Sequence, residues 1–181
     1  MICKKNTVLV KVNHLWFLFF RLTLLISLLS LISCEKKDKI GPEDQLGKPA
    51  PTFTLKDLNG NQYSLEQWKG KVVLLRFWAT RCESCKIEMP KLQAGFRNML
   101  ADGFIVVAVN VEDPPEKAGQ LVTELGLTFP VLIDENQKVT NLYQVYGVPT
   151  TFLIDRKGII KERIFGDLNN EAIDKLVKPL L

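Results

Sequence analysis

The chain contains a buried-strand pattern that leads directly into two cysteines and then into a helix-like segment. Residues 72–77 form an almost continuous apolar run, Cys82 and Cys85 follow, and residues 83–101 read as a long helix that Gly103 ends. A continuous apolar run is typical of a central strand that is covered on both faces. This junction therefore predicts an α/β architecture in which central strands run parallel and helices cover the sheet.

The other segments support that architecture. Asn59-Gly60 predicts a hairpin turn after a short strand at 53–55, because both residues tolerate positive φ. Further strands are expected at 104–110, 129–133, 150–154 and 159–165, and further helices at 64–68, 114–125, 137–146 and 170–180. We therefore expect a central mixed sheet flanked by helices.

The spacing of Cys82 and Cys85 at a helix start is typical of a redox pair. The N-terminus of a helix carries partial positive charge and free N–H groups, so it stabilises a thiolate. Cys82 is expected to be the exposed nucleophile of low pKa, and Cys85, one turn further along, its less accessible partner. Two other interpretations of this spacing are a structural zinc site, which needs two more ligands, and a structural disulfide.

Residues 1–33 have the composition of a secretory leader. They contain four basic residues and no acidic ones, and residues 22–32 are apolar and rich in leucine. That apolar run is shorter than the roughly 20 residues that span a bilayer. Extending it back to residue 15 reaches spanning length but includes Arg21, so an uncleaved signal anchor is the alternative.

The end of this leader resembles a bacterial lipobox. Leu31-Ile32-Ser33-Cys34 has the aliphatic and small residues that precede the lipidated cysteine in such signals. The resemblance implies a lipoprotein signal peptide at 1–33, lipidation of Cys34, a flexible charged tether at 34–46 and a folded domain at 47–181. The protein is then expected in the cell envelope, extracytoplasmic, and anchored to a membrane by its lipid.

Composition removes several classes of function. Outside the leader, 20 basic residues balance 20 acidic ones, so the domain has no electrostatic attraction for nucleic acid. With Cys3 and the single histidine, His14, in the leader and Cys34 lipidated, the domain retains only Cys82 and Cys85. This excludes a Cys/His zinc site and a histidine-based triad. We expect no metal and no cofactor.

Two motifs resemble the thioredoxin-like proteins of the TlpA/ResA type. They are residues 77–80 (Phe-Trp-Ala-Thr) with 82–86 (Cys-Glu-Ser-Cys-Lys) and 88–90 (Glu-Met-Pro), and residues 147–155 (Gly-Val-Pro-Thr-Thr-Phe-Leu-Ile-Asp). The resemblance implies a thioredoxin-like fold with an N-terminal hairpin extension and an inserted strand–helix unit at about 104–126. Members are membrane-tethered thiol–disulfide oxidoreductases outside the cytoplasm, commonly reductants, and several serve cytochrome c maturation.

The resemblance also implies roles for particular residues. Cys82 and Cys85 form the redox-active disulfide. Pro149 matches a cis-proline that lies against the cysteines and leaves the backbone of Val148 free to bind an extended substrate; an ordinary trans-proline is the alternative. Trp78 is expected to pack and to form part of the wall of the site. Glu88 matches an acidic residue that takes the proton of Cys85, and a solvated helix glutamate is the alternative.

The chain departs from this family at three positions. Arg81 replaces an aromatic residue, and a cation there favours the Cys82 thiolate, although Glu83 opposes it. Ser84 stands where relatives often have proline. Arg76 lies inside the predicted central strand, and because a buried arginine needs a partner, we expect it near Glu88 or another acid, which would keep Glu88 ionised.

The residues and the resemblance together therefore predict a monomeric thiol–disulfide oxidoreductase whose partners are protein substrates with disulfides or thiols. The resemblance also implies a membrane thiol electron donor. A thiol peroxidase is an alternative because residues 47–68 also resemble the start of redoxin and peroxiredoxin domains. Peroxiredoxins have Thr or Ser three residues before the reactive cysteine, whereas this chain has Ala79. A copper carrier using the two thiolates is a second alternative, with no third ligand visible.

Overall fold

The computed structural model describes residues 45–181 and builds them around a seven-stranded sheet in the order β2-β1-β5-β4-β3-β6-β7. The strands are β1 (Thr54–Asp57), β2 (Gln62–Ser64), β3 (Val72–Trp78), β4 (Phe104–Asn110), β5 (Val131–Ile133), β6 (Thr150–Ile154) and β7 (Ile160–Phe165). β3, β4 and β5 run parallel, while β1, β6 and β7 pair antiparallel with their neighbours. The predicted mixed sheet and N-terminal hairpin are confirmed.

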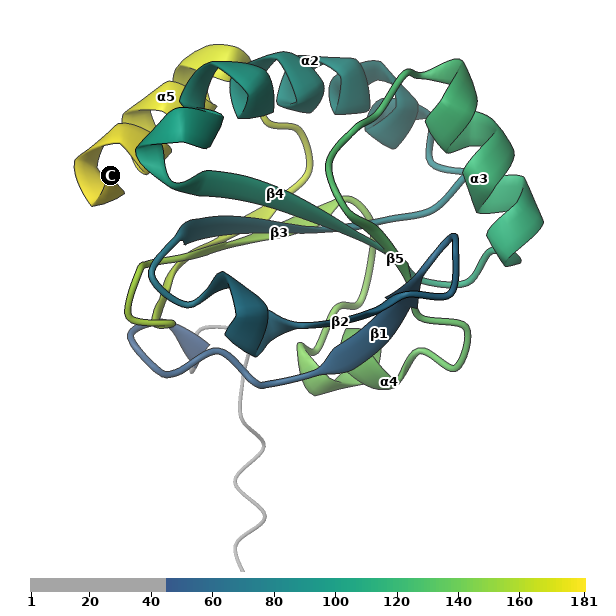
Figure 1. The fold of residues 1–181 in the computed structure, drawn as a ribbon, viewed down its shortest axis with the longest axis horizontal. Coiled ribbons are helices and arrows are strands. Elements are labelled where there is room, and N and C mark those ends of the chain that lie inside the picture. The colour runs from purple at the N-terminus through teal and green to yellow at the C-terminus, as the bar shows by residue number, and fades with distance from the viewer. Residues whose placement is uncertain (1–44) are drawn as a thin grey trace, which may run out of the picture. The chain divides into compact units, whose positions relative to one another are not determined.

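Helices cover this sheet. They are α2 (Glu83–Met99), α3 (Pro115–Glu124), α4 (Lys138–Leu142) and α5 (Asn170–Val177), with 3-10 turns η2 (Leu65–Trp68), η3 (Leu100–Asp102) and η4 (Lys178–Leu180). Figure 1 shows α2 and α5 side by side over one face of the sheet, with α4 beyond the other face. The predicted strand–helix unit at about 104–126 is β4 and α3, and β4 lies in the middle of the sheet.

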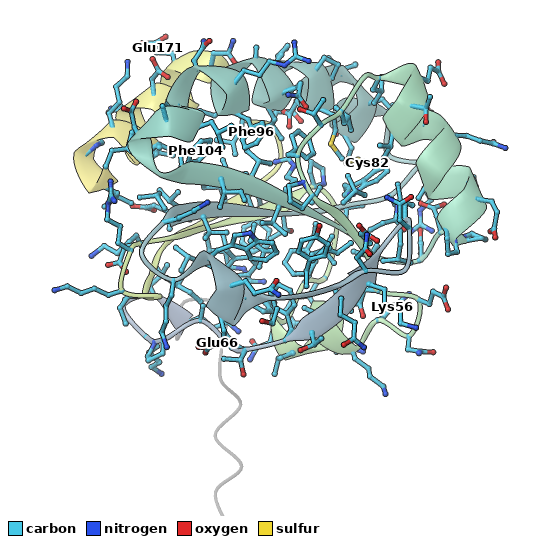
Figure 2. All side chains as sticks on the ribbon, in the orientation of Figure 1. Lys56, Glu66, Cys82, Phe96, Phe104 and Glu171 are labelled. Atoms are coloured by element: carbon cyan, nitrogen blue, oxygen red, sulfur yellow. A yellow bond between two sulfur atoms is a disulfide. The ribbon has the colours of Figure 1, made fainter. Side chains whose placement is uncertain are left out.

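The core lies between α2 and the central strands. All seven residues of β3 and all seven of β4 are buried. Phe96 of α2 and Phe104 of β4 fill the layer between helix and sheet, 7% and 1% exposed (Figure 2). Because β3 and β4 are parallel and in register from Val72↔Phe104 to Trp78↔Asn110, their carboxyl ends meet at one edge of the sheet. The loops that follow them are therefore neighbours.

The opposite face of β3 holds an aromatic cluster. The ring of Tyr143 lies 5.5 Å from Phe77 and 5.1 Å from Phe152, and its hydroxyl donates to the carbonyl of Pro51 at 2.7 Å. This contact explains why α4 is shorter than the helix predicted at 137–146. Tyr143 turns into the core directly after α4, and Gln144 takes a positive φ of 52°, which ends the helical path.

The predictions for the N-terminal region fall outside the described residues. They are the signal peptide at 1–33, lipidation of Cys34 and most of the tether at 34–46. Within residues 45–181, no helix combines the length and the apolar character that crossing a bilayer requires.

Candidate active site

The two cysteines lie at the junction between β3 and α2. Cys82 is the N-cap of α2, its sulfur accepts a hydrogen bond from the backbone N–H of Cys85 at 3.2 Å, and a disulfide joins the two residues. Figure 2 shows Cys82 at the end of α2 that faces the carboxyl ends of the strands. Cys82 is half-buried and Cys85 has no exposed surface. Of the two cysteines, only Cys82 therefore presents surface to a second protein.

Polar and charged side chains lie around Cys82. The hydroxyl of Ser84 lies 3.6 Å from the Cys82 sulfur, a contact that the sequence analysis did not anticipate. The guanidinium of Arg81 forms an ion pair with Glu112 in the loop after β4. Because Glu112 draws and partly neutralises this cation, Arg81 favours the Cys82 thiolate less than an unpaired arginine at that position.

A buried carboxylate fixes the loop between β3 and Cys82. The backbone N–H and hydroxyl of Thr80 donate to Asp113 at 2.6 and 2.5 Å, and the side-chain amide of Asn110 donates to the same carboxylate at 2.9 Å. Burial by itself raises the pKa of Asp113, but the hydrogen bonds from Thr80, Asn110 and Lys117 lower the pKa to about 2. The loop that carries Cys82 is thus tied to the loop after β4.

The second motif lies beside the first. The Val148–Pro149 bond is cis, as predicted, and both residues are half-buried. β6 begins directly after them and pairs with the end of β3 through Phe77↔Thr150. Pro149 also accepts a hydrogen bond from the N–H of Gly166 at 3.0 Å. Val148 and Pro149 therefore offer surface at the edge of the sheet where the cysteines lie.

Trp78 differs from what the family resemblance implied. Its side chain has no exposed surface and lies among the core residues. The expected packing is present, but the side chain presents nothing to a substrate. We therefore assign Trp78 to packing rather than to substrate contact.

Arg76 and Glu88 form a buried ion pair between β3 and α2, as predicted. Their side chains are 0% and 3% exposed. The same guanidinium donates to the hydroxyl of Thr151 at 2.7 Å and to the carbonyl of Gly166 at 3.3 Å. The second carboxylate oxygen of Glu88 accepts from the N–H of Leu168 at 2.7 Å. Glu88 is therefore not a solvated helix residue.

Opposing influences act on the Glu88 carboxyl. Burial raises its pKa above the ordinary value, and the nearby Asp167 acts in the same direction. The charge of Arg76 and the Leu168 amide oppose this rise. A cavity of about 100 Å³, lined by Ser84, Glu88 and Asp167 among others, opens beside the first two turns of α2. The carboxyl has a raised proton affinity and lies one turn after Cys85.

The sequence analysis missed four contributors to this region: Thr80, Asn110, Asp113 and Thr151. A signal was available for two of them, because Asn110 is the polar last residue of an otherwise apolar strand and Asp113 follows it three residues later. Within residues 45–181, no three Cys, His, Asp or Glu side chains gather in a metal-binding cluster.

Comparison with known proteins agrees with this geometry. The model of the AhpC/TSA family matches residues 46–163. The chain is similar to thiol-disulfide oxidoreductase ResA of Geobacillus kaustophilus, 39% identical over 72% of this chain and 75% of the relative. The chain is also similar to thiol-disulfide oxidoreductase ResA of Bacillus subtilis, 36% identical over 74% of this chain and 76% of the relative.

A solved structure supports the same assignment. The thioredoxin-family thiol:disulfide interchange protein of Chlorobium tepidum aligns with a TM-score of 0.67 at 28% identity, over 73% of this chain and 94% of that one. The thioredoxin-like fold is thereby confirmed. The chain belongs to the AhpC/TSA family and, within it, to the thioredoxin-like thiol–disulfide oxidoreductases.

Proposed function

We propose that this protein reduces disulfide bonds in other proteins outside the cytoplasm, while a lipid on Cys34 holds it at a membrane. One observation carries the redox part of the proposal: the disulfide-forming pair at the start of α2 joins a half-buried cysteine to a fully buried one. That asymmetry suits a reaction in which one cysteine meets the substrate and the other completes the exchange.

The reaction has two exchanges. The Cys82 thiolate attacks one sulfur of the substrate disulfide, and the other substrate sulfur leaves as a thiolate. Cys85 then gives its proton to Glu88 and attacks the Cys82 sulfur, which forms the Cys82–Cys85 disulfide and releases the second substrate thiolate. Two electrons pass from the cysteine pair to the substrate, and a membrane thiol donor restores the reduced pair.

The substrates are proteins with accessible disulfides. The half-buried segment at Val148 and Pro149 lies at the edge of the sheet where Cys82 lies, which supports the binding of an extended polypeptide next to the reacting sulfur. Among such substrates we propose the cysteine pairs of apocytochromes c. This part of the proposal rests on the resemblance of the two motifs to proteins of the TlpA/ResA type.

The anchoring proposal rests on Leu31-Ile32-Ser33-Cys34. When the protein is expressed in a bacterial host, Cys34→Ser is expected to move it out of the lipid-labelled membrane fraction, because the residue that accepts the lipid is gone. Fractionation after labelling with a radioactive fatty acid measures this. Equal labelling of the variant and the wild type contradicts lipidation at Cys34.

The reduction potential of the Cys82–Cys85 pair tests the direction of electron flow. We expect a value near or below about −250 mV, in the range of thioredoxin, as a protein-disulfide reductase requires. Equilibration with glutathione or dithiothreitol buffers measures it on the purified protein. A value near about −120 mV is that of an oxidant and contradicts the proposed direction. Rapid consumption of hydrogen peroxide by the same preparation supports the peroxidase alternative instead.

A further inference from the structure

Arg76 occupies an unusual place for a permanent cation. It lies in the middle of β3, has no exposed surface, and its guanidinium reaches α2 through Glu88 and β6 through Thr151. It also donates to the carbonyl of Gly166, in the segment after β7. The guanidinium thus joins the helix that carries Cys85 to the strand that follows Pro149. The cation connects the segments that surround the cysteines.

The charges that face Glu88 come from three directions. β3 supplies Arg76, the segment after β7 supplies Asp167 and the N–H of Leu168, and the next turn of α2 supplies Lys91, which lines the same cavity. Lys91 is exposed to solvent, which weakens its effect. Burial and Asp167 both favour a protonated Glu88, so the ionised form depends mainly on the buried contact with Arg76.

An ionised Glu88 is what the second exchange requires. The Cys85 S–H bond must break before its sulfur can attack Cys82, and the proton goes to a Glu88 oxygen. A glutamic acid that already holds a proton cannot accept another. Since the proposed reaction uses Glu88 as the acceptor, the group that fixes its protonation state also controls the rate of this step.

We propose that Arg76 is a positioning residue for the second exchange, which keeps Glu88 ionised and holds its carboxylate in place one turn after Cys85. This inference rests on the proposed function, because it assumes that Glu88 accepts the Cys85 proton. Arg76 does not touch the reacting sulfurs and acts only through Glu88. The hydrogen bond to Thr151 fixes the guanidinium of Arg76, so that the positive charge stays next to the Glu88 carboxylate.

The test uses the full-length reduced protein with Cys3 and Cys34 replaced by serine, so that Cys82 and Cys85 are its only thiols, and the disulfide 5,5′-dithiobis(2-nitrobenzoate). Release of the first thionitrobenzoate reports the attack by Cys82, and release of the second reports the attack by Cys85. Arg76→Gln keeps a polar side chain without the charge. We expect it to slow the second release at pH 7 by about tenfold or more, leave the first release unchanged, and shift the second phase to higher pH. Arg76→Lys, which keeps a cation, is expected to slow the second release less than Arg76→Gln does.

The Glu88→Gln background separates the possible outcomes. If Arg76 acts through Glu88, Arg76→Gln slows the second release in the wild type but adds nothing in Glu88→Gln. Equal slowing in both backgrounds, or slowing of both releases, overturns the inference. If Glu88→Gln itself leaves the second release unchanged, the proposed role of Glu88 fails, and the inference falls with it. Arg97→Gln, an exposed arginine in the last turn of α2, is the matched control and is expected to change neither phase.

A measurement on the wild type keeps the inference testable if Arg76→Gln does not fold. Carbon-13 NMR follows the Glu88 carboxyl of the reduced protein during a pH titration. The inference requires that this carboxyl is ionised at pH 7. A Glu88 that is still protonated at pH 7 overturns it.

Discussion

Replacing Cys82 by serine is expected to abolish disulfide reduction, with a rate at least about a thousandfold lower than that of the wild type. Cys82 is the half-buried cysteine at the start of α2, and a serine hydroxyl is a far weaker nucleophile than a thiolate at neutral pH. Cys85→Ser is expected to behave differently. It retains the first exchange and then stops, because no second thiol is present to release the substrate.

The two variants can be distinguished on one protein substrate. Non-reducing electrophoresis is expected to show a covalent complex with substrate for Cys85→Ser and none for Cys82→Ser. Cys34→Ser, assayed in detergent, is the matched cysteine control and is expected to reduce disulfides at the wild-type rate. A covalent complex formed by Cys82→Ser through Cys85 contradicts the assignment of roles, since Cys85 has no exposed surface.

Replacing Asp113 by asparagine is expected to lower the free energy of unfolding by about 2 kcal/mol at pH 7. The pKa of Asp113 is about 2 in the folded protein, below its ordinary value of 3.8. A carboxyl with a depressed pKa stabilises the fold above its unfolded pKa, and this contribution is lost as the pH falls through the folded pKa. The wild type therefore loses this stabilisation between about pH 4 and pH 2.

Chemical denaturation at several pH values measures the effect. The difference between the wild type and Asp113→Asn is expected to be largest near neutral pH and to shrink below pH 4. Asp57→Asn is the control. Burial raises the pKa of Asp57, but hydrogen bonds from Asn59, Gly60 and Asn61 outweigh it and lower the pKa, and they lie within the β1–β2 hairpin, which does not carry the cysteines. Asp57→Asn is expected to leave the reduction potential unchanged, whereas Asp113→Asn loosens the Thr80 loop and alters it. A pH-independent difference for Asp113→Asn contradicts this account.

Local patterns predicted the parts of the site that follow each other in the chain. The apolar run before Cys82 and the helical segment after it indicated the strand–helix junction, and the structure places Cys82 at the N-cap of α2. Energetics predicted an acidic partner for Arg76, with Glu88 as one candidate. A buried cation requires a counter-charge, and Glu88 is an acid on the helix that covers β3.

Contacts between segments that are distant in sequence were not predictable in the same way. Thr80 and Asp113 are 33 residues apart and meet only because parallel pairing brings the ends of β3 and β4 together. Thr151 became a partner of Arg76 through the register Arg76↔Thr151, which depends on how β6 aligns with β3. A single sequence specifies each strand better than the alignment between strands. α4 is shorter than predicted for a related reason: Tyr143 packs into the core through contacts with segments that are distant in sequence.

The two edge strands of the sheet affect whether copies of the protein aggregate at high local concentration. β2, at one margin, has three residues, while β7, at the other, carries exposed Lys161 and Glu162 and is capped at its start by hydrogen bonds from Gly47 and to Lys48. Short, charged or covered margins are poor templates for adding a foreign strand. The proposed binding of extended polypeptides at Val148 and Pro149 is thus combined with edge strands that offer few unpaired backbone groups to another strand. We expect many copies crowded on one surface to remain separate molecules rather than to join into fibres.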